Sequence, residues 1–224
     1  AAAGGRIVAP IAAPNPPLRS FAALLTPRAV TPETSPMTFA RPKRINGRVP
    51  VLTAEEAVKY IPDESTLCVL GAGGGILEAT KLIEALAERY KTTQTPKNIG
   101  IISPTGLGDR AERGISPIAQ EGLVKWALCG HWGQSPRISE LAEQNKIFAY
   151  NYPQGVLTQM LRASAAHQPG ILSEIGLGTF VDPRNQGGKL NDITKEDLIS
   201  LVNLEGKEYL YYLSLIHISE PTRH

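Results

Sequence analysis

The residues best suited to chemistry lie in two short segments, each between a predicted strand and a predicted helix. The first is Gly71-Ala-Gly-Gly-Gly75. Glycines at such a point let a ligand approach main-chain N–H groups, and the dipole of the following helix favours an anion. The second is Asn151-Tyr-Pro-Gln-Gly155, where the Gln154 amide can donate a hydrogen bond to a substrate oxygen. Together the two segments predict a site for an anionic or carboxylate ligand.

Both segments also have a purely structural interpretation. The segment Gly71 to Gly75 is not a dinucleotide-binding fingerprint, because Ile76 stands where that pattern needs glycine and Lys91, not an acidic residue, follows about 20 residues on. It is not a P-loop, because no Gly-Lys-Ser/Thr follows. A tight strand-to-helix turn would explain these glycines, and a simple turn would explain Gln154.

Other reactive side chains form no recognisable centre. Cys129 and His131 lack the further ligands of a zinc site, and His131 beside Trp132 is interpreted as a packed or surface histidine. Ser103 and Ser173 lie in no nucleophile-elbow sequence. The sequence therefore assigns no catalytic residue and no metal ligand.

Hydrophobic patterning predicts an α/β fold, with a mainly parallel sheet flanked by helices. Capping boxes at Thr53–Glu56 and Thr194–Asp197, and Ser135 before Pro136, mark helix starts. The expected helices are 53–60, 76–90, 136–144, 153–167 and 194–202. The expected strands are 66–70, 99–103, 124–128, 147–151, 171–175 and 207–212.

Composition limits the function classes. The 224 residues are 42% hydrophobic and 20% charged, typical of a globular protein, and no apolar run reaches the ~18 residues of a membrane span. The formal charge of +2 comes from the ends, since residues 37–212 carry equal numbers of basic and acidic groups, so no basic face for nucleic acid is expected. Cys68 and Cys129 lie in apolar segments and are expected to be buried thiols, which fits a reducing, cytoplasmic compartment.

Composition also divides the chain into three parts. Residues 1–36 are rich in Ala and hold seven of the 18 prolines, so we expect a disordered leader, either an organellar transit peptide or translated sequence upstream of a start at Met37. Residues 213–224 resemble a translated sequencing adaptor, and we expect the natural protein to continue differently after Tyr212. The domain is therefore expected to span residues 37–212.

Six glycine-containing segments follow one another along the chain. They are Arg44-Ile-Asn-Gly-Arg-Val-Pro50, Gly71-Ala-Gly-Gly-Gly75, Ser103-Pro-Thr-Gly-Leu-Gly108, Gly130-His-Trp-Gly133, Tyr152-Pro-Gln-Gly155 and Gly176-Leu-Gly-Thr-Phe180. Taken in this order, they resemble the first half of a family I coenzyme A transferase of the fused acetate, or short-chain acyl, type, and the resemblance covers residues 43–212.

The resemblance implies transfer of CoA from an acyl-CoA to a free short-chain acid through a glutamyl-CoA thioester, with acyl-CoA as substrate and no permanently bound cofactor. The nucleophilic glutamate of such enzymes lies in their second half, so this chain is expected to lack it and to be inactive alone. Gln154 would bind a substrate carboxylate, and Gly73, Gly74 and Gly75 would line the same pocket. The implied partners are the missing half, which would cover an apolar face, and further copies in a homo-oligomer.

Two other classes remain open at this point. One is a nucleotide-dependent oxidoreductase domain that holds a pyrophosphate at Gly71 to Gly75, although its acidic ribose-binding partner is missing. The other is a noncatalytic sugar-phosphate-binding domain, since sugar-phosphate isomerase-like proteins share this α/β architecture. Fold alone does not separate them.

Overall fold

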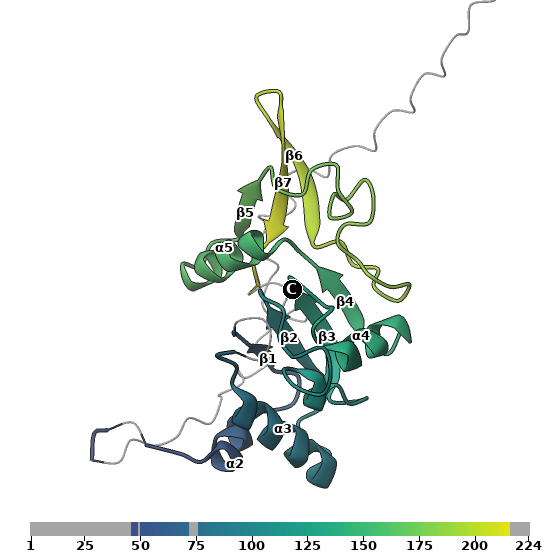
Figure 1. Cartoon of the computed structure of the whole chain (residues 1–224). Coiled ribbons are helices and arrows are strands. Elements are labelled where there is room, and N and C mark those ends of the chain that lie inside the picture. The colour runs from purple at the N-terminus through teal and green to yellow at the C-terminus, as the bar shows by residue number, and fades with distance from the viewer. Residues whose placement is uncertain (1–45, 49, 72–75, 216–224) are drawn as a thin grey trace, which may run out of the picture. The chain divides into compact units, whose positions relative to one another are not determined.

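Two sheets organise the structure, a computed structural model that describes residues 46–48, 50–71 and 76–215 (Figure 1). The first sheet is entirely parallel, in the order β1-β2-β3-β4. Its strands are β1 (Thr66–Cys68), β2 (Ile99–Ser103), β3 (Val124–Cys129) and β4 (Phe148–Asn151). The second sheet is antiparallel, in the order β5-β7-β6. Its strands are β5 (Gly170–Ser173), β6 (Ile199–Leu204) and β7 (Lys207–Leu213).

Helices precede, connect and follow the parallel strands. The longer ones are α3 (Thr80–Thr93), α4 (Pro136–Glu143) and α5 (Gln154–Ala165). The short ones are α2 (Ala54–Ala57), which continues into η1 (Val58–Tyr60), and η2 (Ser116–Ile118). Among the residues described, no helix combines the length and the apolar character needed to cross a membrane.

The parallel sheet is buried on both faces, which is why all five residues of β2 are buried. Side chains alternate along the strands, so Ile101 packs in one cluster with α3 and α4, whereas the next residue, Ile102, packs in another with α5. This second cluster includes Leu210 and Tyr212 of the antiparallel sheet. The parallel sheet thus lies between a helical layer and a mixed layer of α5 and the antiparallel sheet.

A row of tyrosines joins the two sheets. The ring of Tyr152, just after β4, packs edge-on against Tyr150 and Tyr212, with centroids 6.3 and 5.5 Å apart. Tyr212 donates a hydrogen bond to the Ile175 carbonyl at 2.7 Å, but the buried Tyr152 hydroxyl has no partner among the described residues. The row fixes the end of β4 to the antiparallel sheet.

The segment between β5 and β6, which holds Gly176 to Phe180, is fixed by a buried carboxylate. Asp182 accepts hydrogen bonds from the Gly178 N–H at 2.9 Å and from the Arg184 guanidinium at 2.7 Å. Hydrogen bonding to Arg184 holds the pKa of the Asp182 carboxyl well below its usual range. The carboxylate therefore stays charged and holds this loop together, and Arg184 links the loop to Glu208 of β7 at 3.1 Å.

Much of the expected element order is confirmed. The Thr53 capping box forms with both of its bonds, Glu56 N–H to Thr53 Oγ1 at 3.2 Å and Thr53 N–H to Glu56 Oε2 at 2.9 Å. The strands at 99–103 and 207–212 are present, the latter one residue longer. Leu215, which follows β7, is buried in the second core cluster. Residues 1–36 lie outside the described part of the chain.

Two expectations near β1 are wrong. The helix predicted from Ile76 begins only at Thr80, because Leu77 has a left-handed backbone with φ 55° that interrupts a right-handed helix, and Ile76 is exposed. Cys68 is also exposed, because β1 is the outermost strand of the described sheet and its outer side is uncovered. Cys129, on the inner strand β3, is buried as expected.

The helix predicted from the second capping box is also wrong. Thr194 does not cap a helix: its hydroxyl accepts from the Ala149 N–H at 2.8 Å and donates to Asn191 Oδ1 at 2.5 Å. The residues from Ile199 form β6, paired in register with β7. Hairpin pairing with β7 across the two-residue Glu205-Gly206 turn, in which both residues have positive φ, therefore overrode the helix signal.

The unpaired Tyr152 hydroxyl generates a stability prediction. Tyr152→Phe removes a buried group that lacks a partner, so we expect no loss of stability, whereas Tyr212→Phe removes a made hydrogen bond and should cost about 1 kcal/mol. Urea unfolding of the chain and both variants measures the difference. Equal losses in the two variants would show that the Tyr152 hydroxyl is paired.

Candidate functional site at the carboxyl edge of the parallel sheet

Four loops leave the parallel sheet at the same edge, because parallel strands all end on one side. The ends of the three inner strands are in register: Ser103 pairs with Cys129, and Cys129 with Asn151. Backbone bonds continue the alignment one residue further, from the Gly130 N–H to the Ser103 carbonyl at 2.9 Å and from the Tyr152 N–H to the Cys129 carbonyl at 3.2 Å. The loops after β2, β3 and β4 therefore start side by side.

Gly130 lets these loops approach closely. A Cβ added at Gly130 would lie 2.1 Å from the Pro104 carbonyl oxygen and 3.4 Å from the Gln154 Cα. No side chain fits there. Gly130 thus brings the backbone of Gln154 next to the loop that follows β2. The sequence analysis did not predict this role for Gly130.

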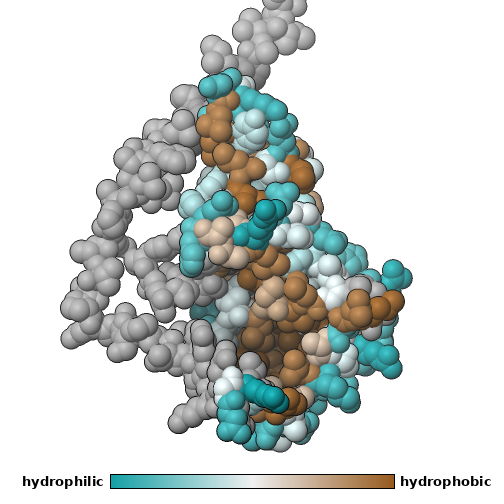
Figure 2. Space-filling view, turned by 90° about the vertical axis from the view of Figure 1, so that its left-hand side faces the viewer, coloured by the Kyte–Doolittle hydropathy of each residue, from teal (hydrophilic) through white to brown (hydrophobic). Residues whose placement is uncertain are grey.

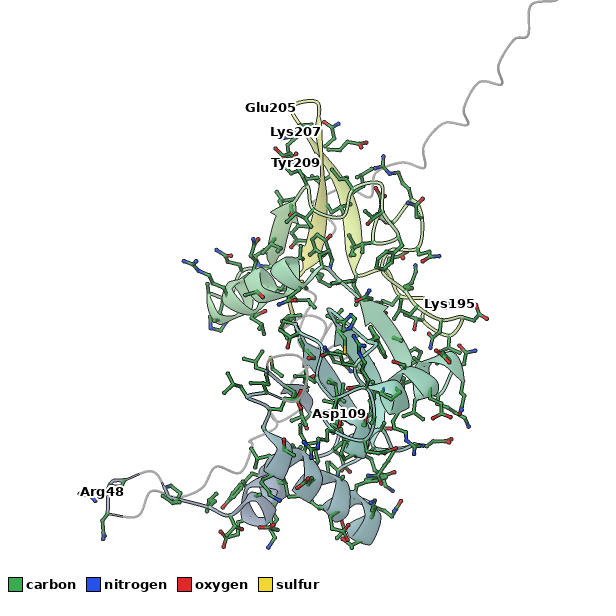
Figure 3. The ribbon with its side chains drawn as sticks, viewed as in Figure 1. Arg48, Asp109, Lys195, Glu205, Lys207 and Tyr209 are labelled. Carbon is green, nitrogen blue, oxygen red and sulfur yellow. The ribbon has the colours of Figure 1, made fainter. Side chains whose placement is uncertain are left out.

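The loop after β2 is tied to its neighbours at several points. Thr105 Oγ1 donates to the Gly71 carbonyl at 2.9 Å, and the Gly108 N–H donates to Glu78 Oε1 at 2.7 Å. On the other side, the Ser135 hydroxyl donates to the Leu107 carbonyl. Ser135 was expected to cap α4, but its hydroxyl makes this loop contact and no cap bond. The loop beyond Gly108 continues to Asp109, labelled in Figure 3.

Gln154 begins α5 and its side chain is exposed. Within the described ranges its amide makes no hydrogen bond to protein, and the preceding Pro153 provides no side-chain cap. Asn151 belongs to the segment singled out in the sequence, but its role was not predicted: it fixes the start of this loop. Its amide nitrogen faces two carbonyls and donates to that of Cys129 at 2.7 Å and to that of Gly130 at 3.2 Å. Among the described residues, the Asn151 amide is therefore anchored, whereas the Gln154 amide is free.

Gly73, Gly74 and Gly75 lie outside the described residues, so their placement in the same pocket remains a prediction. Gly71, the last described residue before them, lies at this edge through its bond from Thr105.

The other reactive groups form no catalytic or metal centre in the described part of the chain. The Ser103 hydroxyl donates to the Thr105 carbonyl at 2.7 Å, and Ser173 accepts from the Ile175 N–H at 3.1 Å, so both have structural partners. Burial raises the pKa of the Cys129 thiol to about 12. No group of three or more His, Cys, Asp or Glu residues capable of holding a metal occurs among the residues described.

Fold and edge together define an α/β protein in which glycine-containing loops meet at the carboxyl edge of a parallel sheet. Residues 51–218 match the family described as Coenzyme A transferase. The chain belongs to the coenzyme A transferase family, which confirms the resemblance and the fold class. The family match gives no support to the oxidoreductase or sugar-phosphate interpretations.

Individual relatives are close in sequence. The chain is 81% identical over 179 residues to the acetate CoA-transferase YdiF of Escherichia coli K12, covering 80% of this chain and 34% of that protein. It is 41% identical over 165 residues to the caffeate CoA-transferase of Acetobacterium woodii, covering 73% of this chain and 31% of that protein. The chain thus spans about a third of the length of both relatives.

A solved structure agrees with the fold. The crystal structure of the E. coli O157:H7 acyl-CoA transferase YdiF, a thioester complex with CoA, matches with a TM-score of 0.77 at 80% identity. The match covers 79% of this chain and 34% of that chain. The α/β arrangement described above is therefore that of a CoA-transferase.

Two glycines at the edge yield a matched prediction. Gly130→Ala should destabilise the chain, because the new methyl group would overlap the Pro104 carbonyl. Gly155→Ala should leave stability equal or raise it by up to about 1 kcal/mol, because nothing lies within 4 Å of its added Cβ and alanine favours a helix. Thermal unfolding distinguishes the two. Destabilisation by Gly155→Ala would show that a described neighbour occupies that space.

Proposed function

We propose that this chain forms one side of the active site of a CoA-transferase that exchanges CoA between an acyl-CoA and acetate or another short-chain acid. The observation that carries the proposal is the 81% identity to an acetate CoA-transferase over the part of the chain that holds all four edge loops. The free amide of Gln154 at this edge supports it, since an exposed donor beside a loop cluster suits a carboxylate.

The proposed reaction proceeds in covalent steps. A glutamate carboxylate attacks the thioester carbonyl, the C–S bond breaks and CoA leaves as a thiolate, giving an acyl-glutamyl anhydride. The thiolate then attacks the glutamyl carbonyl and the first acid leaves as its carboxylate. The second acid reverses these steps and takes the CoA. We propose that the glutamate belongs to the part of the enzyme that this chain does not span, and that Gln154 orients the acid.

That remaining part would also cover an apolar face on this chain. Beside the edge strand β1 is a hollow of about 260 Å³ between β1, α2 and α3. Figure 2 shows apolar side chains gathered on this side of the molecule. Of the residues that line the hollow, Leu70 and Leu82 are exposed. Patches of this kind mark interaction sites, and we propose that residues 37–212 form an incomplete enzyme whose missing part packs here.

Gln154→Ala should lower kcat/KM for the acid substrate about 10- to 100-fold, because one hydrogen bond to a charged group contributes about 1.5–3 kcal/mol. The protein tested is a full-length chimaera, in which residues 37–212 replace the matching part of the 81% identical E. coli enzyme. Gln159→Ala, also exposed on α5, is the control and should have no effect. Unchanged kinetics in Gln154→Ala would remove Gln154 from the site.

The 224-residue chain alone should show no CoA transfer, whereas the chimaera should be active.

A thiol reagent at pH 8 tests whether the missing part covers the apolar face beside β1. Cys68, which borders the hollow, should react in the chain alone and become protected in the chimaera, while Cys129 should stay unreactive in both because of its raised pKa. Activity of the chain alone, or equal reactivity of Cys68 in both proteins, would contradict this proposal.

A further inference from the structure

Unpaired buried oxygens gather around the loop that follows β2. Three buried side-chain atoms have no hydrogen-bond partner among the described residues: Glu78 Oε2, Gln134 Oε1 and the Tyr152 hydroxyl. The first two flank the same loop. A Cβ added to Gly106 would lie 2.6 Å from Gln134 Oε1, and the other oxygen of Glu78 accepts from Gly108 two residues further on.

Glu78 packs between the end of β1 and this loop. Its Oε1 receives the Gly108 N–H at 2.7 Å, and its Cγ would lie 2.9 Å from a Cβ added to Gly71. Its carboxylate is the only acidic side chain bonded to residues 103–108 in the part of the chain that the structure describes. A backbone N–H bonded to a carboxylate makes a charge-assisted bond, stronger than one to a neutral oxygen.

The arrangement is costly for folding alone. A buried carboxylate oxygen without a donor retains its desolvation penalty, and folded proteins pair nearly all such atoms. Positions where a protein departs from such a rule are often functional sites, and this one lies at the edge that holds Gln154.

We propose that Glu78 is a positioning residue for the transferase reaction: it holds Gly108, and with it the loop after β2, in place at the carboxyl edge. The inference rests on the proposed function. Glu78 does not touch substrate in this account. It acts through the backbone of the loop after β2, which it binds at Gly108. This loop lies beside the loop that carries Gln154, because Gly130 allows the Pro104 carbonyl to approach the Gln154 backbone.

The test uses the full-length chimaera defined above. Glu78→Ala should lower kcat at least about tenfold and leave KM for acyl-CoA within about threefold, because a displaced loop disturbs alignment more than binding. Glu78→Gln keeps an oxygen that can accept from Gly108 and should restore most of kcat. Glu88→Ala and Glu88→Gln, on the exposed face of α3, are matched controls and should match the parent enzyme. All assays are run well below the melting temperature of each variant.

Hydrogen exchange at the Gly108 amide provides a readout independent of activity. Exchange should be faster in Glu78→Ala than in the parent and Glu78→Gln. An unchanged kcat or unchanged exchange in Glu78→Ala overturns the proposal. If Glu78→Ala does not fold, Glu78→Met is tested in its place, because methionine fills the space without an accepting oxygen. If neither variant folds, Glu78 is needed for the fold itself, and the proposal is overturned. An inactive parent chimaera would instead contradict the proposed function, and Gly108 exchange would still test the contact.

Discussion

The in-register pairing of the parallel strands is the constraint on which the rest of the structure depends. Because Ser103, Cys129 and Asn151 end their strands side by side, three loops begin at one edge. Each loop alone is a short, glycine-containing turn. Side by side, they form a surface with backbone N–H groups and a free amide. This surface lies at the carboxyl edge of the sheet, where α/β proteins bind ligands.

The loops are then held at short range by groups that no local pattern reveals. Gly130 removes the side chain that would separate β3 from Pro104, and Asn151 bonds the backbone of the neighbouring strand. On the other side of the fold, Tyr152 connects the end of β4 to the antiparallel sheet. The antiparallel sheet therefore contributes to the site indirectly, by fixing the residue two positions before Gln154.

Local sequence patterns predicted the elements that local interactions determine. The helix start at Thr53 and the strand at 99–103 were predicted correctly, since a cap bond and a strand buried on both faces leave clear patterns in the sequence. Thr194 has the same pattern as Thr53, but its hydroxyl bonds Ala149, 45 residues away, and pairing with β7 makes the next segment a strand. Ala149 is too distant in the sequence to be predicted from spacing, whereas β6 and β7 are a hairpin whose Glu205-Gly206 turn the sequence analysis did not identify.

The site was predictable in part. Gln154 could be predicted at the edge because a turn between a strand and a helix in a parallel sheet must lie there. Glu78 could not be, because its partner Gly108 lies 30 residues away and only the sheet order brings them together. The exposure of Cys68 was missed for the same reason: its apolar neighbours gave no sign that β1 is the outermost strand.

The central claim is that this carboxyl edge binds the substrates of CoA transfer. A crystal structure of the full-length chimaera with a bound acyl-CoA tests it most directly. The account predicts that the thioester lies against the loops after β2, β3 and β4, with the Gln154 amide within hydrogen-bond distance of the acyl or carboxylate oxygen. An acyl-CoA bound away from this edge, with Gln154 still facing solvent, would contradict it.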